Sequence, residues 1–352
     1  MRRLVTTFAS AGALLLFTAA PSVACGGLIG PNGAVNLLRT TTFAGYHDGV
    51  EHYVTAFEFA GGEGEFGSIV PLPGIPSNVE KGGDWTLQRL VLETDPPELD
   101  FRVLAAAEAA GSAEVLQEVR IDALDVTILR GGGDEVGTWA KDHGFRLPPD
   151  APEVLDFYAR RSPIFMAAVF DADAARERGQ AVGDGTPVHL TIPTEDPWVP
   201  LRILGLGKAA TEPVEADVYL LTDQRPELLP GPLSHDELIL DHSARATDQL
   251  LADLRSDQGM EWVPDAAWLT KLVIDADAAD LSYDLAISTD GGRPDPVAAG
   301  LEWPLGTSVV PERSSGGLDL GVLPWLLAVA VPVVLSAALA SILRRRWPLA
   351  GA

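Results

Sequence analysis

Residues 322–343 constrain this chain more than any other segment, because these 22 residues carry no charge and three arginines, 344–346, follow directly. About 20 predominantly apolar residues cross a bilayer as a helix, and a basic cluster next to such a helix stays on the cytoplasmic side. We therefore expect a transmembrane helix over 322–343 and a cytoplasmic tail over 344–352. The Gly-, Ser- and Pro-containing segment 306–321 is expected to be a flexible stalk.

The N-terminus has the three-part pattern of a secretory signal peptide. Two arginines are followed by an apolar run and then by small residues that end at Ala24. Cleavage of a signal peptide of residues 1–24 would leave Cys25 at the mature N-terminus. A lipid anchor on Cys25 is an alternative that stays open, although Ser22 stands where lipoprotein signals usually carry leucine. Both ends together place the bulk of the chain outside the cell membrane.

The charge differs between these compartments. The whole chain has 25 basic and 50 acidic side chains, and the exported part alone holds 20 and 49, a net charge of −29. Such an acidic surface excludes a nucleic-acid binder, since binding to polyphosphate needs basic surface. A hydrophobic content of 47% is sufficient for a folded core, and one cysteine forms no intramolecular disulfide.

The exported region, residues 25–305, mixes strand-like and helix-like segments. We expect an α+β fold with mixed or mostly antiparallel sheets and packed helices. The length fits one large domain or two small ones, and a boundary near 112–118 or near 225–232 stays open.

The first two strands of this region are predicted to form a hairpin. Thr40–Tyr46 and Val50–Phe59 are rich in β-branched and aromatic residues, and Asp48-Gly49 between them is a strong turn signal. Further strands are expected at Phe66–Leu72, Val119–Leu129, Ile164–Phe170, Val188–Ile192, Leu201–Leu206, Val214–Leu221 and Leu281–Ile287. Helices are expected at Asp84–Leu92, Asp134–His143 and Ala151–Arg160.

The latter part of the region is expected to be helical. Ser234 to Glu237 reads as a capping box, and Leu240, Ala244, Leu251 and Leu254 then form one apolar stripe. A helix or turn is expected around Trp268–Ile274.

Several short motifs occur in a fixed order along the exported region. They are Ala24-Cys-Gly-Gly27, Phe66 to Pro76, Val126-Thr-Ile-Leu129, Trp139 to Pro148, Leu155-Asp-Phe-Tyr158, Ile164-Phe-Met-Ala167, Pro187-Val-His-Leu190 and Pro200-Leu-Arg-Ile203. This order resembles the bacterial exported family called domain of unknown function 2330. One departure is visible, because Gly67-Ser68 stands where that family tends to carry an aromatic residue. The family has no established activity, so the resemblance implies location and architecture and transfers no catalytic residue.

His47 and His52 flank the predicted hairpin turn. In a two-residue hairpin His47 pairs with Val50 and His52 with Gly45, so both imidazoles fall on one face of the sheet. With neighbouring carboxylates they could form a weak divalent-metal site. A solvated hairpin tip is the other interpretation, since two ligands make no closed site.

Two acidic segments place carboxylates at alternate positions, which suits hard cations. They are Asp171 and Asp173, and then Asp275, Asp277 and Asp280. Neither segment has the central glycine and terminal glutamate of a calcium loop. Loose calcium binding and ordinary solvated charge are therefore the two interpretations.

Recognised catalytic patterns are missing from the sequence. His235 and His242 lie seven residues apart, whereas the two histidines of a zinc metalloprotease motif lie four apart. There is no nucleophile elbow, phosphate-binding loop or dinucleotide fingerprint.

These observations favour a membrane-anchored, extracytoplasmic protein that serves as a binding or assembly module of the bacterial envelope, without enzymatic activity or a required cofactor. Its membrane contact would be residues 322–343, with an envelope component or protein as partner. One alternative is an extracellular hydrolase of envelope glycans or peptides that uses paired carboxylates. Another is a loose calcium-dependent module.

Overall fold

The computed structural model describes residues 22–23, 27–30, 33–34, 39–58, 65–83, 85–95, 115–177, 179, 185–232 and 237–301. All of these belong to the first of two units, Met1–Trp303, and the second unit, Pro304–Ala352, lies outside the described residues. The predicted stalk, transmembrane helix and tail, together with Cys25, therefore lie outside the described residues. Of the predicted signal peptide, only Ser22–Val23 is described.

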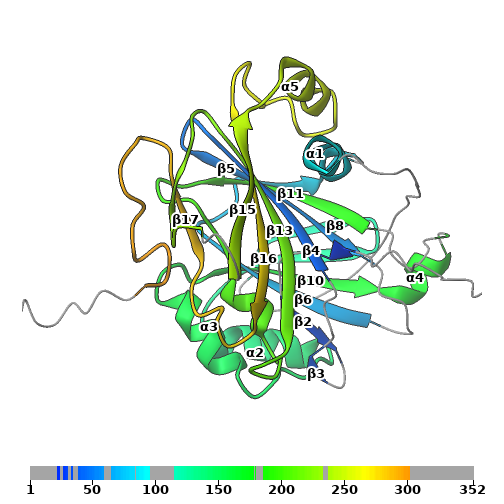
Figure 1. Ribbon diagram of the computed structural model, residues 1–352. Helices are drawn as coiled ribbons and strands as arrows, with labels where there is room; N and C mark the ends of the chain where they lie inside the picture. Colours follow the sequence, from blue (N-terminus) through cyan, green and yellow to red (C-terminus); the bar gives the residue numbers. More distant parts are fainter. Residues whose placement is uncertain are drawn as a thin grey trace, which may run out of the picture. The chain divides into compact units, whose positions relative to one another are not determined.

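The larger of the sheets has eight strands, and seven of them lie in the order β15-β16-β13-β4-β5-β11-β7, while β1 pairs with β4 (Figure 1). The bounds are β1 (Ser22–Val23), β4 (Arg39–His47), β5 (Val50–Glu58), β7 (Asn78–Lys81), β11 (Gly185–Pro193), β13 (Pro213–Thr222), β15 (Glu237–Arg245) and β16 (Trp268–Asp277). Neighbouring strands are antiparallel except where β4 pairs with β13 and with β1.

The hairpin predicted at Asp48-Gly49 joins β4 and β5. Both turn residues have positive φ angles, 50° and 78°, which is the conformation of the two-residue turn that matches strand twist. His47 lies opposite Val50 and Gly45 lies opposite His52, in the predicted register.

A second sheet of six strands is antiparallel throughout, in the order β3-β2-β6-β10-β9-β8. Its strands are β2 (Gly27–Gly30), β3 (Gly33–Ala34), β6 (Glu65–Leu72), β8 (Val115–Ile121), β9 (Leu124–Arg130) and β10 (Ile164–Asp171). A third, small sheet contains β12 (Trp198–Val199), β17 (Leu285–Ser288) and β14 (Glu227–Leu229).

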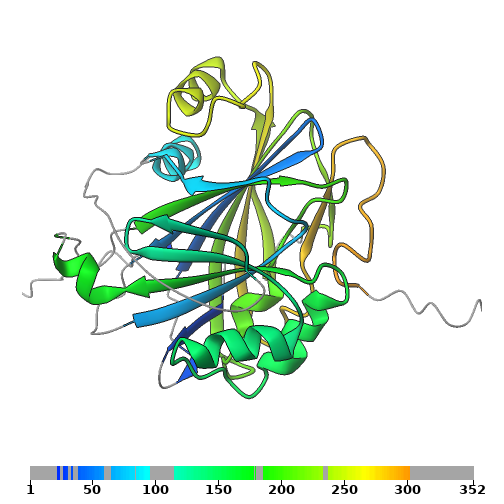
Figure 2. The same ribbon diagram turned by 180° about the vertical axis from the view of Figure 1, so that it is seen from behind.

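Three apolar clusters stack these elements into layers. The central cluster joins inward side chains of the two large sheets, such as Val70 and Met166 from one and Val218 and Leu272 from the other. A second cluster packs α2 (Gly133–Asp142) and α3 (Ala151–Ala159) on the outer face of the six-stranded sheet, as seen from behind in Figure 2. A third packs α1 (Thr86–Thr94) and α5 (Asp248–Arg255) on the outer face of the eight-stranded sheet. Most strands are therefore buried on both faces.

The predicted α+β class with mostly antiparallel sheets is confirmed. The hairpin strands, β6, β10, β11, β13 and the three early helices lie where the sequence predicts them, within a few residues. The single strand expected at Val119–Leu129 is instead the pair β8 and β9, which turns at Asp122, a residue with φ of 58°. Leu201–Leu206 is not a strand but contains a 3-10 helix, Arg202–Gly205.

The predicted helix from Ser234 onward is wrong. Glu237 begins strand β15, and α5 begins only after Thr247, whose Oγ1 accepts a hydrogen bond of 3.1 Å from the Leu250 amide. Residues 268–274, expected to be a helix or turn, belong to β16. Pairing of β15 with β16 outweighs the local helical spacing, since each strand satisfies the other's backbone groups.

A short helix, α4 (Ala172–Glu177), follows β10. Within the described part of the chain, no helix is long and apolar enough to span a membrane.

Candidate functional site

The structure places His47 and His52 in different surroundings. His47 Nδ1 lies 2.7 Å from Asp223 Oδ1, close to the hairpin tip. His52 is buried, and its Nδ1 lies 3.0 Å from Nε2 of His189 on β11. The His52 ring also stacks on Trp262, with 3.9 Å between ring centroids and 6° between planes. Across the described ranges, no three His, Cys, Asp or Glu side chains group as a metal site.

The three aspartates suggested as calcium ligands are exposed near the end of β16. Asp275 lies opposite Glu215 on β13 and opposite Glu237 on β15, so three acidic residues line up across adjacent strands. Asp277 lies opposite Pro213, and the amide of Asp280 donates a 2.9 Å hydrogen bond to the Asp277 carbonyl. Strand pairing thus places like charges directly opposite Asp275 but not opposite Asp277.

The other histidine and aspartate candidates have structural positions. His242 is on β15 opposite Lys271, and His235 lies outside the described residues. Asp171 Oδ1 accepts hydrogen bonds of 2.9 Å from the amides of Asp173 and Ala174, so this side chain caps α4.

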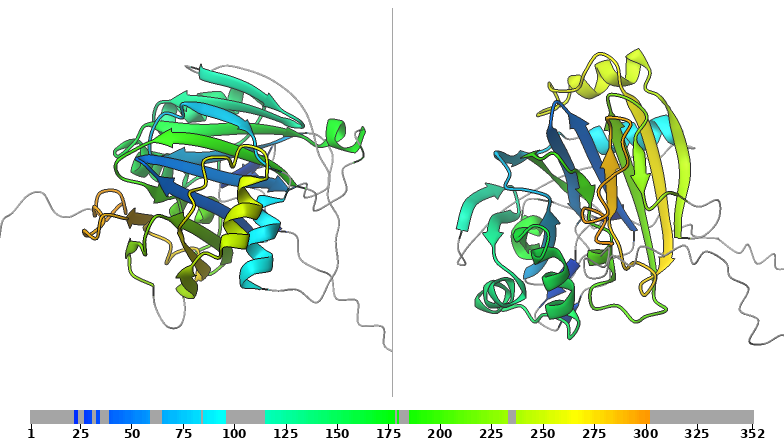
Figure 3. Two further views of the ribbon diagram at one scale, coloured as in Figure 1. Left: turned by 90° about the horizontal axis from the view of Figure 1, so that it is seen from above. Right: turned by 90° about the vertical axis from the view of Figure 1, so that its left-hand side faces the viewer.

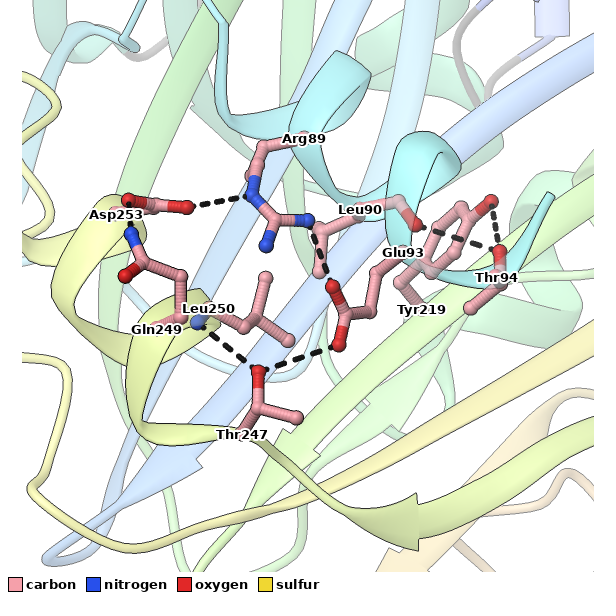
Figure 4. A network of polar contacts seen from close by, with 9 residues as sticks. All are labelled: Arg89, Leu90, Glu93, Thr94, Tyr219, Thr247, Gln249, Leu250 and Asp253. Atoms are coloured by element: carbon pink, nitrogen blue, oxygen red, sulfur yellow. Dashed lines mark hydrogen bonds and ion pairs between the residues drawn. The ribbon is translucent and has the colours of Figure 1, made fainter. Parts of the chain in front are cut away.

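Two helices on the outer face of the larger sheet are joined by a polar network that the sequence did not reveal (Figure 4). Arg89 on α1 donates to Glu93 on the same helix and to Asp253 on α5, both at 2.8 Å. Thr247 Oγ1 lies 3.3 Å from Glu93 and completes the link between the helices. These groups are mutually paired, which indicates a role in helix packing.

Lys271 on β16 is paired beside this network. Its ammonium contacts Asp95, and lies 2.8 Å from Asp241 on β15. Burial lowers the pKa of Lys271, but the hydrogen bonds to Asp241 and Asp95 outweigh it, so the pKa lies above its usual value. Lys271 is therefore a charged structural group and not an amine available for nucleophilic chemistry.

A fully buried acid joins three elements on the other side of the molecule. Asp284 contacts the Arg161 guanidinium and accepts a 2.8 Å hydrogen bond from the Tyr158 hydroxyl. The amides of Leu201 and Arg202 donate to the same carboxylate, at 2.7 and 3.1 Å. Burial raises the pKa of Asp284, and Arg161 with these donors acts against that rise. The carboxylate is thus fully engaged in holding α3, the 3-10 helix and β17 together.

The candidate binding site lies at the β15 end of the larger sheet, which Figure 3 shows from the side. A cavity of about 140 Å³, here called the edge cavity, opens between β15, β16 and the segment around β14. Its lining includes Arg225, Leu228, Gly231, Leu240, Ser243 and Thr270. Among the described residues, β15 is the outermost strand of the sheet at this end, and no described strand pairs with its outer side.

The size of the edge cavity limits what it can hold. Small-molecule sites usually enclose about 300–1,000 Å³, whereas a cavity of about 150 Å³ holds a single benzene ring. The edge cavity, at about 140 Å³, therefore matches one side chain. Leu240, which lines it from β15, is 38% exposed and is one of the few large apolar side chains on the described surface.

The chemistry of the lining is mixed. Thr270 is buried, and its Oγ1 has no hydrogen-bond partner among the described residues. Among the described residues, Glu227 is the one carboxylate in the lining, and these residues offer no second carboxylate to form the pair that a glycosidase-type hydrolase needs.

Sequence comparison identifies the family. The family model described as "Uncharacterized protein conserved in bacteria (DUF2330)" matches residues 19–288. The chain belongs to this family. The resemblance expected from the ordered motifs is thus confirmed.

The departure from the DUF2330 pattern at Gly67-Ser68 has a structural explanation. A Cβ at position 67 would lie 2.9 Å from the Phe145 ring and 3.0 Å from Ile29. Phe145, which follows α2, thus fills the space beside β6, and a larger residue at position 67 would displace it.

No curated protein matches this DUF2330 chain. Among solved structures, a mutated baculovirus P35 after caspase cleavage is similar at 9% identity and a TM-score of 0.39, covering 72% of this chain and all of that chain. Baculovirus P35 itself is similar at 11% identity and a TM-score of 0.38, with 71% and 96% covered. P35 in complex with caspase-8 gives 9% identity and a TM-score of 0.34, with 71% and 90% covered. Scores this low carry no argument about function.

Neither the role of His189 nor the edge cavity can be predicted from the sequence, for the same reason. His189 lies 137 positions from His52, and the cavity combines residues 225–232 with β15 and β16. The sequence offers one signal for the cavity, the Pro- and Gly-rich segment 225–232, and its composition indicates only a loop or a domain boundary.

Proposed function

We propose that this protein is a membrane-anchored, extracytoplasmic binding module of the bacterial cell envelope that binds an extended segment of a partner protein along β15. The observation that carries the proposal is a cavity of one-side-chain size directly beside an outer strand. In strand addition, the main chain of the ligand pairs with a sheet edge, and alternate side chains enter pockets that give specificity. Here β15 would supply the main-chain pairing, and the edge cavity would supply the pocket for one side chain.

The location rests on the sequence. A signal peptide over 1–24 would direct the chain across the membrane before its removal, and a membrane helix over 322–343 would keep the chain attached there. A tethered partner segment then meets β15 at a high effective concentration, so a small contact area is sufficient. Anchoring is tested by expressing the chain with and without residues 322–352. The full chain should sediment with membranes, and its folded unit should be digested by protease added to intact spheroplasts.

Photo-crosslinking in the native cell tests the binding site. A photoreactive amino acid at Leu240 should give an adduct with one protein, whereas the same residue at Val297, which is 48% exposed, should not. Gly231→Trp provides the second arm, since Gly231 lines the cavity, a Cβ there meets no atom within 4 Å, and an indole is large enough to compete for this small space. This variant should lower the yield from Leu240. Equal adducts from both positions, no adduct from Leu240, or a yield that Gly231→Trp leaves unchanged would refute strand addition at this edge.

A further inference from the structure

The hydroxyl groups of the edge cavity indicate what kind of side chain it accepts. Thr270 is 1% exposed, and its Oγ1 has no partner among the described residues. Ser243 Oγ accepts a 2.9 Å hydrogen bond from Trp268 Nε1, so the hydroxyl proton of Ser243 stays available for donation. Both residues line the cavity. A purely apolar occupant would leave the Thr270 hydroxyl buried without a partner, which is costly.

A cation stands at the same cavity. Arg225 is exposed in the lining, and none of the described residues forms a hydrogen bond or ion pair with its guanidinium. The guanidinium is a donor only and binds carboxylates in a bidentate manner. The carboxylate of Glu227, also in the lining, repels an anion, but the lining holds three donor residues, Arg225, Ser243 and Thr270, against this one carboxylate.

We infer that the edge cavity binds a carboxylate, which Arg225, Ser243 and Thr270 hold through hydrogen bonds. The inference rests on the proposed function and specifies its ligand, because the carboxylate would belong to the segment that pairs with β15. An acidic side chain and the C-terminal carboxylate of a partner are two sources of the same chemistry. In a molecule with a net charge of −25, an arginine that pairs with none of the described residues stands beside two hydroxyls, which distinguishes this cavity from the surrounding surface.

The test uses the full chain in detergent, with the threonine methyl groups labelled for NMR. The probes are N-acetyl-aspartic acid N′-methylamide, which carries a side-chain carboxylate, N-acetylvaline, which carries a chain-end carboxylate, and N-acetyl-asparagine N′-methylamide, which is neutral. At least one acid should shift the Thr270 methyl signal in a saturable manner, and the neutral amide should not. The acid with the higher affinity identifies the source of the carboxylate.

Two variants separate recognition from folding. Arg225→Gln should weaken the binding of the acid about tenfold or more, as expected for the loss of a charge-assisted hydrogen bond, whereas Arg293→Gln should leave it unchanged. Thr270→Val should also weaken binding, yet raise the melting temperature of the free protein, since it removes an unpartnered buried hydroxyl.

The outcomes are distinguishable from those of the crosslinking experiment. If the acids shift Thr270 no more than sodium chloride or the neutral amide does, or if Arg225→Gln has no effect, the carboxylate inference fails even when the Leu240 adduct forms. If the Leu240 adduct is absent, the proposed function fails, and saturable acid binding would then show a carboxylate site without a protein partner.

Discussion

His52 Nδ1 lies 3.0 Å from His189 Nε2 in the packed layer between the larger sheet and the loop that carries Trp262. A hydrogen bond at this distance needs one proton on one nitrogen and none on the other, so these two facing nitrogens cannot both be protonated while the pair is formed. The other ring nitrogen of His189 lies 3.3 Å from Glu80 Oε1. The pair thus joins β5, β11 and β7, and any further proton has to enter a buried site.

The histidine pair should make the protein less stable in acid. Burial, together with the positive charge of protonated His189 and His47, lowers the pKa of His52 from 6.5 to about 3. Between pH 6.5 and pH 3, His52 is therefore protonated in the unfolded chain and neutral in the folded chain. The contribution of His52 to stability is fully present above pH 6.5 and is lost as the pH falls towards 3. In urea titrations, His52→Gln should show a smaller loss of unfolding free energy between pH 7 and pH 4.5 than the wild type.

His242→Gln is the control for this measurement, because that histidine lies on β15 away from the pair. If His52→Gln and the wild type lose the same free energy over this range, the pair does not control the acid response.

Glu51 should act in the opposite direction, at higher pH. Burial raises the pKa of this side chain from 4.5 to about 8, and the backbone amide of Trp198 offsets only part of the rise. Above pH 4.5 the unfolded chain releases a proton that the folded chain keeps until about pH 8, so the contribution of Glu51 to stability falls across this window. Compared with the wild type, Glu51→Gln should become progressively more stable from pH 5 to pH 8 in thermal unfolding. A difference between variant and wild type that is the same at pH 5 and at pH 8 would contradict this role of Glu51.

The row of acidic residues beside Asp275 should cost stability. Like charges directly opposite each other on adjacent strands are unfavourable, and Asp275 faces Glu215 and Glu237. Asp275→Asn should raise the unfolding free energy by about 0.5 kcal/mol, less at high salt. Asp277→Asn, opposite Pro213, should change the unfolding free energy little.

The same variants test the calcium alternative. If calcium chloride raises the melting temperature of the wild type more than that of Asp275→Asn, the row binds calcium.

Local turn chemistry was sufficient to predict some elements but not others. Asp48-Gly49 specifies a hairpin by itself, and its register places His47 and His52 on the same face of the sheet, as predicted. The segment after Ser234 has helical spacing and a capping signature, but its partner β16 lies some 30 residues later and no local pattern announces it. The bulge between Leu240 and His242 also interrupts the alternation that would have indicated a strand.

The site depends on non-local contacts even more strongly. Arg225 and Thr270 carry no motif, and they lie together only because β16 pairs with β15 while the segment around β14 covers both. The histidine pair likewise requires β5 and β11 to be neighbours, which is a property of the sheet order. Sequence periodicity identifies strands far better than it identifies their partners.

Gly45 should be required for the packing of Trp262 over the histidine pair. A Cβ at position 45 would overlap the Trp262 ring, which stacks on His52. Gly45→Ala should therefore cost about 1–3 kcal/mol of unfolding free energy and change the Trp262 fluorescence, as overpacking of a filled layer does. Gly231→Ala is the matched control, because a Cβ at that position meets no atom within 4 Å, and it should change stability by less than about 0.5 kcal/mol. In the Trp262→Ala background the Gly45→Ala change should cost much less, since the group it displaces is gone. An equal cost in both backgrounds would show that Gly45 is required for the strand backbone and not for the ring.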